Sequence, residues 1–154
     1  MTTYPHPLGF DLRYLARAFG FAVRLHTWPA TQVAQEDPHD HRFAFVSIPL
    51  RGTFLERRWR INRGWRLGDP AGLTRHACRP AVRGVRPPLE RTGSDGLALD
   101  WHRLRRPLRP YRCALGEIHS YQPVGDGPHV SLVLLGRVRR ETSNVWRRDD
   151  GGDR

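Results

Sequence analysis

The first hydrophobic pattern along the chain has the period of an α-helix. Apolar side chains recur with the spacing i, i+3, i+4, i+7 at Leu12, Leu15, Ala16 and Phe19. On a helix, these positions form one apolar face. Asp11 in front of them is a suitable N-cap, and Gly20 behind them is a suitable stop. The pattern therefore predicts one short helix near the N-terminus.

After Gly20 the pattern becomes that of β-strands. Residues 21–28 alternate between apolar and polar side chains, which predicts a strand with one buried face. Residues 43–50 are nearly all apolar, Gly52 turns the chain, and residues 53–61 run back as the next strand. Further strands are expected at residues 111–115, 130–135 and 142–146.

The stretch between residues 62 and 107 is the least regular part of the chain. Glycine and proline interrupt it repeatedly, so only short strands are expected there. The segments with strand character are residues 65–67, 73–76, 81–85 and 97–102. The whole sequence holds fifteen glycines and thirteen prolines among short apolar runs, which favours an all-β sandwich or barrel rich in turns.

The length of the chain is that of one domain. A chain of 154 residues can bury a complete core without a disulfide or a partner. The sequence therefore predicts a single domain over residues 1–148 and a disordered polar tail at residues 149–154. The two cysteines, Cys78 and Cys113, have no zinc-finger spacing and are expected to be free thiols.

Two histidines stand in front of the apolar stretch at residues 43–50. His39 and His41 are two residues apart, so on a strand both side chains point to the same side. Two imidazoles aimed at one point are half of a transition-metal site, and a third ligand would complete a site with open positions. Such a site suits the activation of dioxygen, water or a carbonyl group. Two exposed histidines in a turn are the alternative interpretation.

The residues around this pair resemble the first sequence motif of the cupin family. That motif continues from the histidine pair to a glutamate and then to a glycine. Counted from His41, the glycine falls on Gly52, but Phe45 stands where the glutamate would be.

The second cupin motif has a counterpart further along the chain. Its core is Pro-x-Gly-x-x-His, which resembles residues 114–119, with Ala114 in the place of the proline. Gly116 and His119 occupy the glycine and histidine positions. The asparagine that usually closes the motif is replaced by Pro123.

This resemblance implies a fold and a metal site. The fold would be a single cupin barrel, a double-stranded β-helix or jelly roll, with the short N-terminal helix added to it. The metal ligands would be His39, His41 and His119. The missing glutamate makes the chain similar to the thiol dioxygenases of the cupin superfamily, which bind iron through three histidines. The chain also resembles small bacterial and phage-associated cupins.

The activity implied by the resemblance is that of a non-haem iron(II) oxygenase. It would use O2 and act on a small, polar and anionic metabolite. One alternative is a cupin that uses zinc, nickel or manganese as a Lewis acid in isomerase, cyclase or lyase chemistry. Another alternative is a cupin that binds a small molecule without turning it over.

Other side chains could join or support the metal centre. His129 stands ten residues after His119 and could replace it, although the Gly-x-x-His spacing favours His119. Glu56 could bind the metal or act as a base beside it. Because Arg57 and Arg58 directly follow Glu56, a solvent-facing carboxylate is the expectation.

Three arginines on predicted strands could hold a substrate carboxylate. Arg24, Arg58 and Arg60 each offer a guanidinium group for a bidentate pair. Alternation alone does not fix which of them faces inward, because bulges shift the parity of a strand. Four aromatic residues are expected to fill the core rather than line a pocket, namely Phe43, Phe45, Trp59 and Tyr121.

The net charge of +11 would suggest a nucleic-acid partner if it were concentrated in one place. All 26 basic residues are arginine, however, and they are spread from Arg13 to Arg154. This favours a solvated basic surface, or a basic cavity mouth, and predicts no specific nucleic-acid partner. The sequence contains no run of eighteen apolar residues, so a cytoplasmic protein without membrane contact is expected. A homodimer is a possible assembly.

Overall fold

The structure is a computed structural model that describes residues 3–5, 11–28, 37–66, 72–78 and 89–148. The described residues form eleven β-strands and no helix. The strands are β1 (Thr3–Pro5), β2 (Asp11–Ala18), β3 (Phe21–Trp28), β4 (Phe45–Arg51), β5 (Thr53–Ile61), β6 (Gly72–Cys78), β7 (Leu89–Arg105), β8 (Tyr111–Cys113), β9 (Ile118–Val124), β10 (His129–Leu135) and β11 (Ser143–Arg147). The predicted all-β class is therefore confirmed.

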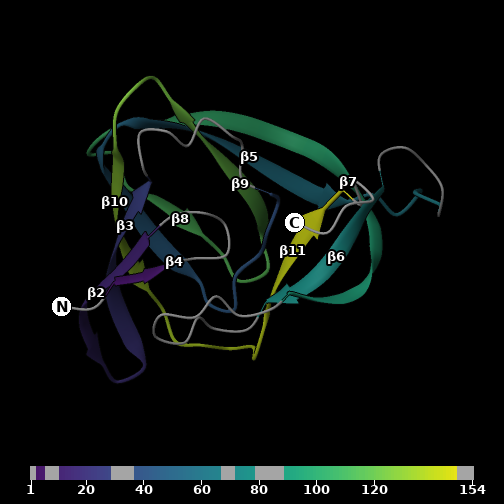
Figure 1. Ribbon diagram of the computed structural model, residues 1–154, viewed down its shortest axis with the longest axis horizontal. Coiled ribbons are helices and arrows are strands. Elements are labelled where there is room, and N and C mark those ends of the chain that lie inside the picture. Colours follow the sequence, from purple (N-terminus) through teal and green to yellow (C-terminus); the bar gives the residue numbers. More distant parts are fainter. Residues whose placement is uncertain (1–2, 6–10, 29–36, 67–71, 79–88, 149–154) are drawn as a thin grey trace.

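The strands are arranged in two antiparallel sheets that lie on opposite sides of the molecule (Figure 1). The first sheet has the order β1-β2-β3-β10-β4-β8, and the second has the order β11-β6-β7-β5-β9. In the first sheet β10 lies between β3 and β4, although it is far from both in sequence. The chain thus returns to its first sheet after completing most of the second, as in a jelly roll.

The segment around His39 joins the two ends of the second sheet. His39 and His119 of β9 exchange two backbone hydrogen bonds of 2.8 Å each. On the other side, His39 is bridged to Val145 of β11, and the Asp40 amide donates to the carbonyl of Asn144 at 3.0 Å. Two of the candidate metal ligands, His39 and His119, are therefore built into the backbone ladder that bridges β9 and β11.

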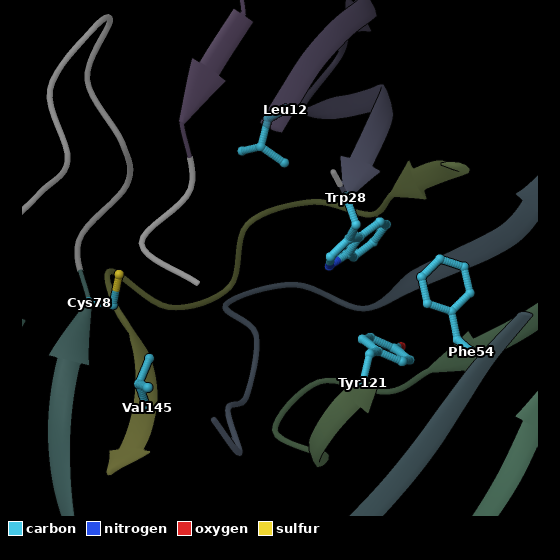
Figure 2. Packing of buried hydrophobic residues seen from close by; sticks show 6 residues of the cluster. All are labelled: Leu12, Trp28, Phe54, Cys78, Tyr121 and Val145. Atoms are coloured by element: carbon cyan, nitrogen blue, oxygen red, sulfur yellow. The ribbon is translucent and has the colours of Figure 1, made fainter. Parts of the chain in front are cut away.

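The hydrophobic core draws side chains from both sheets. Figure 2 shows one cluster, formed by Leu12, Trp28, Phe54, Cys78, Tyr121 and Val145. The rings of Trp28 and Phe54 meet edge to face at 4.9 Å between centroids, a favourable aromatic geometry. Each large apolar side chain buried in this way contributes roughly 1.5–3 kcal/mol to folding. The cluster holds the two sheets together beside the candidate site.

The predicted N-terminal helix is wrong, because residues 11–18 form β2. This strand pairs antiparallel with β3, and the turn between them passes through Phe19 and Gly20, both with positive φ. The helical period does not correspond to burial, because Leu15 is 41% exposed and Phe19 is 90% exposed. Leu12 and Tyr14 instead face the interior together, two residues apart, as strand geometry requires.

Most of the other strand predictions agree with the structure. Residues 21–28 and 53–61 are strands with the predicted bounds. The segment predicted at 97–102 is part of one long strand, β7, which begins at Leu89, whereas β9 had no predicted counterpart. Residues 81–85 and 149–154 lie outside the described residues. In the part that is described, no helix is long and apolar enough to cross a membrane.

Candidate metal centre

The structure brings the three histidines of the cupin-like motifs together. His39, His41 and His119 each offer one ring nitrogen as a ligand, and these three atoms all lie within 4.8 Å of one another. The ring centroids are 4.6–4.9 Å apart, and the Nε2 atoms of His41 and His119 are 2.7 Å apart. Adjacent ligands at right angles, with metal–nitrogen bonds of about 2.1 Å, would lie roughly 3.0 Å apart. The spacing therefore fits two neighbouring ligands after a small adjustment.

An oxygen atom lies beside the Nδ1 atom of two of the three rings. The Nδ1 atom of His39 is 3.0 Å from the carbonyl oxygen of Asp37, and a protonated Nδ1 can donate to it. The Nδ1 atom of His119 faces the carboxylate of Glu56 at 3.5 Å. A partner on Nδ1 leaves the lone pair of Nε2 for a metal, as in many metal sites. Both rings thus present the atom that ligation needs.

Burial keeps the imidazoles of His39 and His119 neutral. It lowers the pKa of His39 to about 4, and the pKa of His119 is well below its usual value for the same reason. The positive charge of Arg58 lowers both pKa values further. Neutral imidazole is the form that binds metal, so the donor set fits a divalent transition-metal ion at neutral pH.

Asp40, the residue between the two histidines of the pair, fixes the segment from its other side. Its buried carboxylate accepts hydrogen bonds from the backbone amide and the side-chain amide of Asn144, at 2.7 and 2.9 Å. It also accepts one from Arg140 at 3.0 Å, and Arg140 donates to the carbonyl of His41 as well. Asp40 therefore positions the pair, a role that the sequence analysis missed.

Glu56 is not solvent-facing, so that expectation is wrong. Its side chain is fully buried and forms ion pairs with Arg58 at 2.7 Å and Arg105 at 2.5 Å. The inward face of β5 carries Phe54, Glu56 and Arg58, and charged residues are accepted there because they pair with one another. Glu56 thus stands next to His119 as a partner of its ring.

The remaining candidates lie at different places. Arg58 is buried opposite His119 and binds Glu117 as well as Glu56. Arg60 is 71% exposed and lies 3.9 Å from an aspartate on the surface. Arg24, in contrast, lines the cavity next to the histidines.

His129 lies apart from the donor cluster. Its ring packs against Phe54 at 5.0 Å between centroids, and its Nε2 is 3.2 Å from the carbonyl oxygen of Val124. A Cβ atom at Gly52 would lie 2.2 Å from this ring, which explains why a glycine stands there. His129 therefore fills space beside the turn at Gly52, and among the described residues it does not join the three clustered histidines.

Both cysteines are free and buried, as expected. The sulfur of Cys113 lies 3.9 Å from Nδ1 of His119, whereas the Nε2 atom of that ring is the one that faces His41. Burial raises the pKa of Cys113 to about 12, so at neutral pH it is a thiol and a poor metal ligand.

A cavity of about 610 Å³ adjoins two of the three histidines. His39 and His41 form part of its wall, and the first sheet provides much of the rest, including Arg24 and His26. Three of the four aromatic residues expected in the core, Phe43, Phe45 and Tyr121, are buried but line this cavity.

The imidazole of His26, in the cavity wall, is expected to make the stability of the fold depend on pH. Burial lowers the pKa of His26 to about 3, and the positive charge of Arg24 lowers it further. In the unfolded chain a histidine titrates near pH 6.5, so between these values only the unfolded state binds the proton. Stability therefore falls as the pH falls, by about 1.4 kcal/mol per unit.

A His26→Gln variant should lose this component. Between pH 7 and pH 5, the unfolding free energy of the wild type should fall by about 2 kcal/mol more than that of the variant, when both proteins are free of metal. Urea denaturation at the two pH values measures the difference. An unchanged pH dependence would show that His26 is not held neutral by burial.

No protein-family model and no curated protein matches the sequence. The structure is similar to that of an oxalate oxidase, with a TM-score of 0.51 and 14% identity over 90% of this chain and 55% of that chain. It is also similar to peruvianin-I, a cysteine peptidase from Thevetia peruviana latex, with a TM-score of 0.50 and 10% identity over 89% of this chain and 66% of that chain. At such identities the similarity shows a shared fold alone, and the chain spans between about half and two thirds of these proteins.

Proposed function

We propose that this chain, which has the double-stranded β-helix of the cupins, is a metal-dependent enzyme that acts on a small molecule. The observation that carries the proposal is the convergence of His39, His41 and His119, two of which, His39 and His41, lie at the wall of a cavity. Catalytic metal sites characteristically use three protein ligands and leave a position open, whereas structural sites are closed by a fourth.

Iron(II) is the metal that we propose, with zinc, nickel or manganese as the alternatives. Iron(II) would supply direct reaction of a bound substrate with O2, without an organic cofactor. Phe45 occupies the place of a carboxylate, with its ring 4.7 Å from that of His41. Three neutral ligands leave the charge of a divalent ion uncompensated, so the open positions favour an anionic substrate.

The surrounding residues would hold and shield the centre. The Asp37 carbonyl and the Glu56 carboxylate fix the orientation of two ligand rings. The rings of Phe43 and Phe45 flank His41 at 5.6 and 4.7 Å and keep water from that side. Arg24 in the cavity wall offers a cation to the substrate.

Oxygen uptake tests the proposed reaction. Protein reconstituted with iron(II) should consume O2 when given a substrate from a panel of thiols, amino acids and other carboxylic acids. Consumption should require both iron and substrate, and the His41→Ala variant should show only the background rate of free iron. Full occupancy by zinc or nickel after purification, with no oxygen consumed by the iron form on any substrate that binds, would instead favour Lewis-acid chemistry.

A further inference from the structure

The size and lining of the cavity restrict what the centre can act on. Its volume of about 610 Å³ lies in the range of roughly 300–1,000 Å³ that accommodates drug-sized ligands. Aromatic rings line much of it, among them Tyr14, Trp28, Phe43, Phe45, Tyr111 and Tyr121. A small amino acid would leave most of this surface without contacts, whereas a ligand that contains a ring would pack against it.

Among the described residues three arginines line this cavity, Arg17, Arg24 and Arg42, and Arg24 is the one whose guanidinium lies over the Phe43 ring. Arg24 lies in the first sheet, in register with Tyr14 on one side and Val133 on the other. Its guanidinium donates to the Tyr14 hydroxyl and lies 4.4 Å from the centre of that ring. The Nε atom of Arg24 is buried and has no hydrogen-bond partner among the residues that the structure describes. In the described part of the chain, no carboxylate pairs with this guanidinium, so its charge is available to an anionic ligand in the cavity.

The aromatic side chain of Phe43 connects this cation with the metal ligands. Its ring lies 5.4 Å from the guanidinium carbon of Arg24 and 5.6 Å from the ring of His41. Phe43 and His41 are nearly parallel, with 28° between their planes. A ligand that pairs with Arg24 and extends toward the three histidines therefore passes along the Phe43 ring.

We propose that the cavity selects aromatic carboxylates, with the carboxylate paired to Arg24, the ring packed beside Phe43, and the far end directed toward His41. This inference rests on the proposed function for the reaction that follows binding, but binding itself needs only the cavity and Arg24. The carboxylate accepts from a guanidinium that is already oriented by Tyr14, which gives a strong charge-assisted pair. A ring-bearing acid, rather than a small thiol, is then the expected substrate class.

Calorimetric titration of 3-phenylpropanoate tests this inference, in the protein both freed of metal by a chelator and reconstituted with iron. Two matched probes separate the contributions. The neutral 3-phenylpropanamide lacks the charge, and propanoate lacks the ring. We expect the aromatic acid to bind at least tenfold more tightly than either, since each probe loses one of the two interactions. Equal affinity for the amide, or for propanoate, would overturn the proposal.

A pair of variants locates the carboxylate. Arg24→Met retains an unbranched side chain without the charge and should weaken binding of 3-phenylpropanoate at least tenfold, while leaving the amide nearly unchanged. Arg60→Met removes an exposed arginine of the other sheet and should leave both affinities unchanged. If Arg24→Met fails to fold, the preference of the wild type for acid over amide still decides the question. Retention of that preference in a folded Arg24→Met variant would contradict the assignment.

The same titrations separate this inference from the proposed function. Selective binding of the aromatic acid by a protein that takes up no metal would support the cavity assignment and refute the metal-dependent enzyme. Stoichiometric metal uptake without preference for the aromatic acid would refute the cavity assignment and leave the metal centre in place.

Discussion

Replacing Glu56 by glutamine is expected to lower the free energy of unfolding by about 3–5 kcal/mol, because two arginines would lose a buried counter-ion. Arg58 and Arg105 lie 2.7 and 2.5 Å from the Glu56 carboxylate, and their side chains are 7% and 13% exposed. Glutamine keeps the volume of the side chain, so the loss reflects charge rather than a cavity. Urea denaturation of the wild type and the variant measures the difference.

Glu117 provides the matched control. It pairs with the same Arg58 at 2.5 Å, but its side chain is 47% exposed. Water can therefore solvate residue 117 when its charge is removed, and Arg58 keeps its ion pair with Glu56, so Glu117→Gln should cost less than about 1 kcal/mol. If Glu56→Gln cost no more than Glu117→Gln, the buried carboxylate would not be the anion on which this cluster depends.

The same Glu56→Gln variant should also weaken metal binding. The Glu56 carboxylate faces Nδ1 of His119 at 3.5 Å, and partners of this kind typically contribute about 10–100-fold to metal affinity. Competition with a chromophoric chelator measures the affinity, and Glu117→Gln again serves as the control. An unchanged affinity would show that His119 is oriented without help from Glu56.

The strands could be predicted from the sequence wherever their pattern was local. Alternation in residues 21–28 and the turn at Gly52 determine two strands whose bounds agree with the structure. Residues 11–18 misled the prediction, because their apolar spacing also fits a helix. These residues form a strand because they pair with β3. The spacing of apolar residues within one segment does not reveal such pairing with another segment.

In the candidate site, too, residues with a local sequence signal could be predicted and residues positioned by distant contacts could not. The histidines could be found because two motifs carry them with a characteristic spacing. Glu56 was assigned to solvent from its charged neighbours, although alternation from the buried Phe54 places it on the inward face of β5. Tyr14 was missed because it reaches the cavity only if residues 11–18 are a strand. Asp40 could not be predicted, since its partners lie about a hundred residues away.

The His41→Ala variant is expected to lose the metal while keeping the fold. His41 is partly exposed at the cavity wall, so its replacement removes one of three ligands with little effect on the core. Two remaining imidazoles hold a divalent ion far less tightly than three. His129→Ala is the comparison, because His129 is the other histidine that the sequence offers as a ligand, and it should retain the metal if the variant remains folded.

The most direct measurement is the metal content of the wild type, His41→Ala and His129→Ala after reconstitution and removal of unbound ions, with circular dichroism as the check on folding. The three-histidine centre predicts close to one equivalent of metal per chain in the wild type and in His129→Ala, and below about one tenth of an equivalent in His41→Ala. A folded His41→Ala protein that retains a full equivalent would contradict it.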